Sequence, residues 1–144
     1  MLQSSVSKGD GEEKAFGPEN LPYEAIGGEV GVRGLVECFY DHMERDAEFA
    51  GIRRLHPEEM RGSREKLFMF LSGWLGGPDL YVKQYGHPKL RARHMPFAIG
   101  EQERDQWLTC MGRAMDERGI GGALRDFLNA RFAHVADFMR NKER

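Results

Sequence analysis

The chain has 144 residues, of which 40% are hydrophobic and 10% aromatic, and this composition is sufficient for one hydrophobic core. Its 21 basic and 23 acidic residues leave a formal net charge of -2, which gives no general attraction to nucleic acid or to an anionic membrane. The N-terminus lacks an apolar signal segment, and no run of about 18 apolar residues is present to span a bilayer. We therefore expect one soluble domain that binds neither nucleic acid nor membrane.

The chain contains two cysteines, Cys38 and Cys110, which lie far apart and outside any CxxC spacing. This pattern predicts neither a disulfide framework nor a thiolate zinc site. We expect two free, buried thiols and a reducing, cytoplasmic location.

Residues 1–20 are polar, rich in Ser, Gly, Lys and Glu, and cannot bury enough apolar surface to offset the entropy of ordering. We predict a mobile N-terminal extension here and a single domain over residues 21–144. The domain begins with a short helical turn at Leu21 to Ile26, which the pair Gly27-Gly28 ends because glycine readily adopts positive φ.

A longer helix follows, in which apolar residues recur with the period of one buried face. They are Val32, Leu35, Val36, Phe39, Tyr40 and Met43. Residues 47–60 lack such a pattern, and His56-Pro57 favours an extended or turn conformation at His56. We predict an irregular loop over one end of the core.

The next predicted helix starts at Gly62-Ser63 and runs to Trp74, where Gly76-Gly77-Pro78 stops it. Residues 78–85 predict a weak turn or short helix. Between Pro88 and Pro96 there is room only for a short helix that ends at His94.

Two further helices are predicted, at residues 100–118 and 123–139, and Gly119 to Gly122 separates them. Glu101 and Glu103 suit the first turn of the former, where acidic groups favour the helix dipole. No alternating pattern of strand length competes with these helices. The fold class is therefore predicted to be all-α.

The segment from Gly86 to Phe97 combines an imidazole at His94 with the guanidinium groups of Arg91 and Arg93. A haem is bound by groups of these two kinds, because its iron takes an axial imidazole and its propionates pair with cations. A single histidine beside basic residues is more often a surface or core residue, so this pattern alone does not settle the ligand.

Several motifs in order together resemble the group II truncated haemoglobins over residues 21–139. They are Phe39-Tyr40, His56-Pro57-Glu58-Glu59, Phe-Leu-x-x-Trp at 70–74 before Gly-Gly-Pro, Gly-His-Pro-x-Leu-Arg-x-Arg-His-x-Pro-Phe at 86–97, and Glu-Arg-Asp-x-Trp-Leu at 103–108. The resemblance implies a two-on-two helical sandwich around haem b, with His94 as the proximal iron ligand.

The resemblance also implies a distal side in which Tyr40 and Trp107 donate hydrogen bonds to a bound diatomic ligand. His56 would add a third polar group there. Ser63 matches the usual distal histidine position, although Gly62 and Arg64 remain neighbouring alternatives. The side chains implied as pocket walls are Leu67, Phe70, Leu90, Phe97 and Met111, and those implied as propionate contacts are Lys66, Tyr81, Arg91 and Arg93.

The other histidines have simpler interpretations. His87 lies in a turn and is expected to cap a helix or face solvent, whereas His42 and His134 are expected to be structural or exposed. Arg91 and Arg93 also fit a solvated charged face. Tyr40 and Trp107 each fit ordinary core packing, with their polar atoms bonded to nearby groups.

We expect a haem protein that binds dioxygen, nitric oxide or carbon monoxide, with redox chemistry such as nitric oxide detoxification or peroxidase-like activity in preference to oxygen transport. No hydrolase or phosphoryl-transfer motif is present. Enzymatic turnover is undecided and would need an external reductase, and the chain is expected to be a monomer or homodimer. The alternative is a helical sensor or partner-binding module that acts through residues 1–20.

Overall fold

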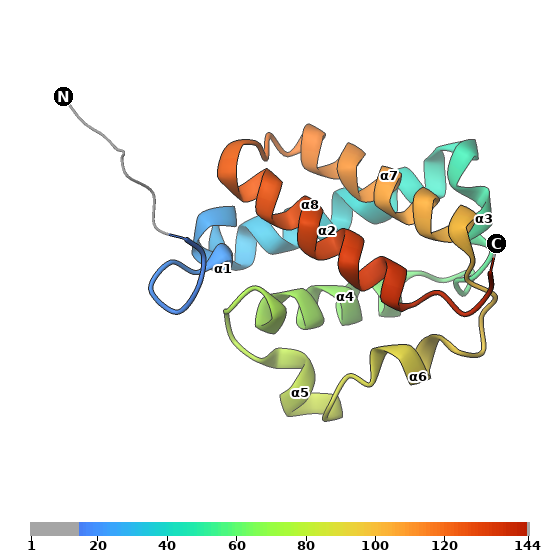
Figure 1. The fold of residues 1–144 in the computed structure, drawn as a ribbon, viewed down its shortest axis with the longest axis horizontal. Coiled ribbons are helices and arrows are strands. Elements are labelled where there is room, and N and C mark those ends of the chain that lie inside the picture. Colours follow the sequence, from blue (N-terminus) through green and yellow to red (C-terminus); the bar gives the residue numbers. More distant parts are fainter. Residues whose placement is uncertain (1–14, 144) are drawn as a thin grey trace.

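The computed structural model describes residues 15–143, and every regular element in this range is a helix (Figure 1). The all-α prediction is confirmed. The predicted extension lies mainly outside the described residues, which begin at Ala15. The elements are α1 (Pro22–Ile26), α2 (Gly28–Arg45), η1 (Ala47–Phe49), α3 (Ala50–Arg53), α4 (Arg61–Trp74), α5 (Leu80–Tyr85), α6 (Leu90–His94), α7 (Glu101–Glu117) and α8 (Gly122–Phe138).

The four longest helices form the body of the domain, in which α2 packs against α4 and α7, and α7 packs against α8. Figure 1 shows the short helices α5 and α6 beyond α4, on the side away from α7. No helix in residues 15–143 is long and apolar enough to cross a membrane.

The predicted buried face of α2 is confirmed. Its six apolar side chains are each at most 5% exposed, because their helical spacing places them together between α4 and α7. They are Val32, Leu35, Val36, Phe39, Tyr40 and Met43.

The prediction of an irregular loop at residues 47–60 is wrong for the first half of this segment, which forms the short helices η1 and α3. Phe49 and Ile52, three residues apart, are buried and hold these short helices against the core. Two apolar positions are too few to show a helical period in the sequence. The α4 helix begins at Arg61, one residue before its predicted start.

Residues at the beginning of the described range contact the last helix. The Phe16 and Phe127 ring centroids lie 4.9 Å apart, and Gly17 and Asn20 exchange backbone hydrogen bonds of 3.0 Å. The described part of the polar extension therefore packs on α8.

The turn between α1 and α2 requires glycine, as the sequence predicts. Gly27 and Gly28 have φ values of +110° and +66°, a region that side chains disfavour. At Gly31 the backbone is close to the preceding helix, and a Cβ there would lie 2.0 Å from the carbonyl oxygen of Ile26.

We predict that Gly31→Ala lowers the free energy of unfolding by about 1–3 kcal/mol, because the backbone of α1 would have to move. Gly62 is a matched control, since a Cβ at this helical position meets nothing within 4 Å. Gly62→Ala should stabilise by about 0.5–1 kcal/mol. Denaturant unfolding of both variants measures the difference, and equal stabilities would contradict the close approach of α1 to α2.

Candidate functional site

A cavity of about 410 Å³ lies among α4, α6, α7 and α8, and most of its lining is apolar. Its size and character are typical of a small-molecule or cofactor site. All but two of the predicted site residues line it. They are Tyr40, His56, Ser63, Lys66, Leu67, Phe70, Tyr81, Leu90, Arg93, His94, Phe97 and Trp107.

His94 is the last residue of α6 and lines this cavity with a half-buried side chain. Its Nδ1 lies 2.6 Å from the carbonyl oxygen of Leu90. Because a carbonyl only accepts, Nδ1 carries the hydrogen and Nε2 keeps a free lone pair. This is the tautomer in which a histidine binds a metal through Nε2.

The position of His94 depends on Asn141, which sequence reasoning missed. The Asn141 side chain donates to the carbonyls of His94 and Phe97, at 3.2 and 2.8 Å, and accepts from the Ile99 N–H at 2.9 Å. The residue therefore ties the segment after α6 to the chain end that follows α8. No local signal shows this, since Asn141 and His94 are 47 residues apart.

Arg91 lies outside the cavity, contrary to its predicted place at the haem rim. Its guanidinium group donates to the carbonyls of Phe138 and Arg140, at 2.6 and 2.8 Å. The carbonyls at a helix C-terminus have no partner within the helix and accept from cations. Arg91 thus caps the C-terminus of α8 and links α6 to that helix.

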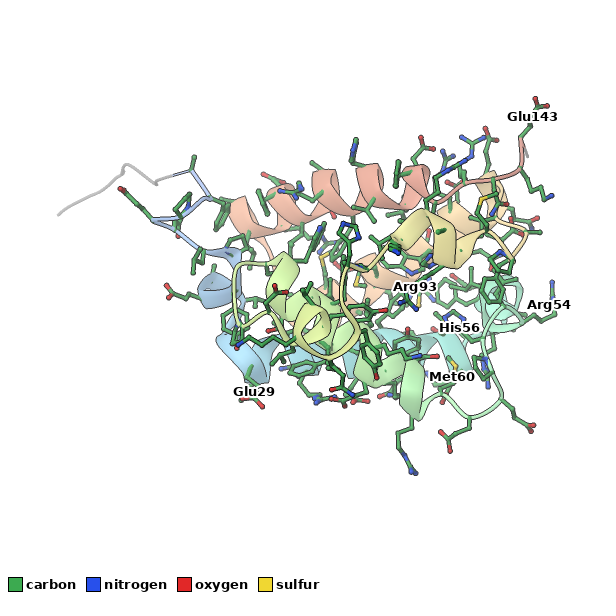
Figure 2. All side chains as sticks on the ribbon, turned by 90° about the horizontal axis from the view of Figure 1, so that it is seen from below. Glu29, Arg54, His56, Met60, Arg93 and Glu143 are labelled. Atoms are coloured by element: carbon green, nitrogen blue, oxygen red, sulfur yellow. The ribbon has the colours of Figure 1, made fainter. Side chains whose placement is uncertain are left out.

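Arg93 does line the cavity, together with Lys66 and Tyr81. Its Nε donates to the carbonyl of Pro88 at 2.8 Å, and its guanidinium carbon lies 5.8 Å from the centre of the Tyr81 ring. Figure 2 labels Arg93 on α6 and His56 after α3, and both side chains line the cavity. Two cations, on α4 and α6, are therefore available to carboxylates in the cavity.

Met111 also lies outside the cavity lining, although it was predicted to form a wall. Its side chain is fully buried in the core. Trp107, one helical turn earlier on α7, packs against the same core cluster but is only partly buried. Trp107 lines the cavity.

Tyr40 and Trp107 flank Phe39, with ring centroids 5.0 and 5.2 Å from that of Phe39, and both line the cavity. Within residues 15–143, no hydrogen bond joins the Tyr40 hydroxyl or the Trp107 indole N–H to another protein group. Burial raises the pKa of Tyr40 well above its ordinary value, so the phenol stays protonated. The cavity therefore contains two unused donors.

His56 lines the same cavity, with its ring 5.8 Å from the Tyr40 ring. Its Nδ1 is 2.9 Å from the carbonyl oxygen of Ile52, and burial lowers its pKa. A neutral ring that donates from Nδ1 has only an acceptor at Nε2. His56 can thus accept a hydrogen bond in the cavity, from the Tyr40 hydroxyl or from a protonated ligand, but cannot donate one in this form.

The lowered pKa of His56 predicts loss of stability in acid. The folded protein binds fewer protons at His56 than the unfolded chain does, so the free energy of unfolding decreases as the pH falls below about 6.5. His56→Gln should reduce this dependence, whereas His134→Gln, at an exposed position, should not. Denaturant unfolding between pH 7 and pH 5 measures it, and identical slopes for wild type and His56→Gln would contradict the assignment.

Of the three candidates for the distal position on α4, only Ser63 lines the cavity. Gly62 is exposed. Arg64 pairs instead with Glu37 and with Asp41, the latter at 3.0 Å.

The remaining histidines lie outside the cavity. His87 is exposed, in agreement with the expectation that it faces solvent, and its Nδ1 accepts from the N–H of Lys89, the residue before α6, at 3.0 Å. His134 is exposed, and His42 is buried in the contact between α2 and α7.

The largest omission from the predicted lining is a face of α8. The sequence predicts a helix at residues 123–139, but helical periodicity does not distinguish a cavity wall from the core. The lining residues missed on α8 and just after it are Phe132, Val135, Ala136 and Met139.

The helical sandwich and its histidine-lined apolar cavity define a truncated globin, and comparisons with known proteins agree. A family model for bacterial-like globins matches residues 21–141. The group 2 truncated hemoglobin YjbI of Bacillus subtilis is 43% identical over 123 residues, which are 85% of this chain and 90% of that protein. The chain belongs to the bacterial-like globin family, as a group II truncated haemoglobin.

Two solved structures are similar in fold as well as in sequence. A cold-adapted truncated hemoglobin from Pseudoalteromonas haloplanktis has a TM-score of 0.83 and 43% identity, covering 86% of this chain and 100% of that one. A truncated haemoglobin from Bacillus subtilis, described as oxygen-avid, has a TM-score of 0.78 and 41% identity, covering 85% and 100%. Globins are haem proteins, so the cofactor is haem b, and the function is the binding of diatomic gases.

The residues of the cavity fit this cofactor. The apolar walls suit a porphyrin, His94 presents a free ring nitrogen, and Lys66 and Arg93 supply cations for its two carboxylates.

Proposed function

We propose that this protein holds dioxygen tightly for redox chemistry such as nitric oxide detoxification or a peroxidase-like reaction, rather than for bulk oxygen transport. The observation that carries the proposal is the pair of donors without a protein partner, Tyr40 and Trp107, in the cavity that His94 also lines. The oxygen-avid haemoglobin of Bacillus subtilis, similar in fold and sequence, supports it.

The proposed roles follow from position. His94 would hold the haem iron through Nε2 on the proximal side, and Lys66, Tyr81 and Arg93 would contact the propionates. When bound, the haem supplies reversible binding of diatomic gases and one-electron redox chemistry. The apolar walls exclude water from the ligand, which strengthens hydrogen bonds to it. These walls include Leu67, Phe70, Leu90 and Phe97.

On the distal side, Tyr40 and Trp107 donate to a ligand that carries partial negative charge. His56 accepts a hydrogen bond at Nε2. The donor is either the Tyr40 hydroxyl, which His56 then orients, or a protonated ligand. Ser63 is small and leaves the distal side open, so ligand retention depends on the donors and not on steric closure.

Nitric oxide detoxification requires an electron from outside the protein. Each nitric oxide takes both atoms of one dioxygen and one electron from the reduced protein, which gives nitrate and leaves the protein oxidised by one electron. A separate reductase returns that electron. The two buried free cysteines fit a reducing, cytoplasmic compartment where such a donor is available.

The test is to mix the oxygenated protein with one equivalent of nitric oxide in a stopped-flow instrument and to assay nitrate. We expect about one nitrate per haem, formed much faster than dioxygen dissociates. Release of dioxygen before any nitrate forms would contradict the proposal and favour simple ligand exchange.

A further inference from the structure

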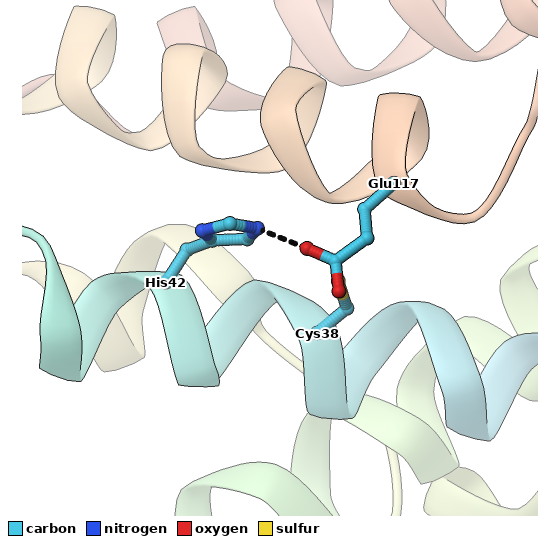
Figure 3. A group of neighbouring side chains, drawn as sticks. All are labelled: Cys38, His42 and Glu117. Carbon is cyan, nitrogen blue, oxygen red and sulfur yellow. Dashed lines mark hydrogen bonds and ion pairs between the residues drawn. The ribbon is translucent and has the colours of Figure 1, made fainter.

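Three side chains with metal-binding atoms meet between α2 and α7, and none of them lines the haem cavity. Cys38 and His42 are one helical turn apart on the same face of α2, and Glu117 reaches them from the end of α7 (Figure 3). Their sulfur, ring nitrogen and carboxylate oxygen atoms all lie within 4.8 Å of one another.

We propose that Cys38, His42 and Glu117 bind a zinc-class divalent cation at a second metal site, distinct from the haem. Zinc takes this set of atoms with nearly tetrahedral geometry, in which neighbouring ligand atoms lie about 3.3–3.6 Å apart. The His42 Nε2 and Glu117 Oε1 atoms are 2.8 Å apart. Metal binding therefore replaces this hydrogen bond and moves the two atoms apart to the spacing of zinc ligands.

The far side of the His42 ring is prepared for metal binding. Its Nδ1 lies 3.0 Å from a carboxylate oxygen of Asp46, and Arg113 donates to the same oxygen at 3.1 Å. A metal-binding histidine commonly donates its other N–H to such a carboxylate, which fixes the tautomer and the ring orientation. Arg45 also approaches Nδ1, at 2.7 Å, and pairs with Asp46 at 3.3 Å. Its side chain is 62% exposed, so metal binding at His42 requires Arg45 to turn toward solvent and leave Nδ1 to Asp46.

The three proposed ligands differ in their exposure to solvent. The Cys38 and His42 residues are 7% and 6% exposed, whereas the Glu117 side chain is 60% exposed. Two ligands are thus held by packing, and the third faces solvent, which gives a path of entry and a fourth position for water. The metal displaces the proton of the Cys38 thiol into solvent, and the resulting thiolate and the Glu117 carboxylate together neutralise the divalent charge.

This site does not follow from cysteine spacing in the sequence. Cys38 and His42 lie at an i, i+4 spacing, but Glu117 is 75 residues from His42 and joins them only when α7 packs on α2. The prediction of no thiolate zinc site rests on the spacing of the two cysteines alone and does not include a histidine or carboxylate from another helix.

The test is to incubate the haem-loaded protein with one equivalent of zinc sulfate, remove unbound metal by gel filtration, and record the zinc-edge X-ray absorption spectrum. This edge does not detect the haem iron. We expect one zinc per chain, with one sulfur at about 2.3 Å and nitrogen or oxygen at about 2.0 Å. Zinc with no sulfur neighbour, as expected for adventitious binding at exposed histidines, would overturn the proposal.

Matched variants test the ligands. Cys38→Ser and Glu117→Gln should weaken zinc binding at least about tenfold in a competition assay with a zinc indicator. Cys110→Ser, at the other buried cysteine, and His134→Gln should leave the affinity unchanged. If Cys38→Ser does not fold, Glu117→Gln still decides, because its side chain is exposed. Equal affinity in wild type and Glu117→Gln would show that the three residues form only a hydrogen-bonded cluster, without affecting the proposed haem function.

Discussion

Replacing His94 with glycine is expected to abolish stable haem binding. The cavity would keep its apolar walls, but the iron would lose the only ring nitrogen that α6 directs into it. We expect haem transfer to an acceptor apoglobin to become at least about 100-fold faster, which corresponds to about 3 kcal/mol of lost binding free energy. Transfer is followed by the shift of the Soret band.

Two comparisons make this result specific. Added imidazole should slow the transfer again, because a small ligand can occupy the space left by the side chain. His87→Gln should transfer haem at the wild-type rate, since His87 is exposed and outside the cavity. Equal haem retention by wild type and His94→Gly would exclude His94 as the ligand.

The double replacement Tyr40→Phe, Trp107→Phe is expected to increase the rate of oxygen dissociation by about 100-fold or more. A hydrogen bond to a charged acceptor contributes about 1.5–3 kcal/mol, so each donor accounts for about 10- to 100-fold. Both substitutions keep an aromatic ring in its place beside Phe39, so the walls of the cavity should change little. Stopped-flow displacement of oxygen by carbon monoxide gives the rate.

The single variants separate the two donors. If both act on one ligand, their effects combine but need not be additive, because each removed donor changes the partners of the other. Phe70→Leu, a change in the apolar lining that removes no donor, is a control with an expected change of less than about tenfold. A double variant that releases oxygen as slowly as wild type would remove the basis for tight oxygen binding.

The sequence predicts the helices well where an apolar face is long. The stripe from Val32 to Met43 identifies α2 and its buried face because six apolar positions repeat with one period. The short helices η1 and α3 are missed because Phe49 and Ile52 are too few to define a period. The segment at residues 86–97 predicts the end of α6 because proline limits the helix on both sides.

The contacts that place the site are harder to predict, because they join residues that are distant in sequence. Arg91 has the charge expected of a propionate contact, but the unpaired carbonyls at the end of α8 take its guanidinium group. Asn141 has no motif, yet it holds the segment around His94. Met111 shares a stripe with Trp107 but packs into the core. Each outcome depends on how α6, α7 and α8 pack, which helical periodicity does not specify.

The most direct test of the central claim, that His94 holds the haem in this cavity, is the resonance Raman spectrum of the ferrous, ligand-free protein. We predict an iron–histidine stretching band in wild type that disappears in His94→Gly and returns at a shifted frequency when imidazole is added. The same band, unchanged in His94→Gly, would show that another histidine binds the iron and would contradict the account.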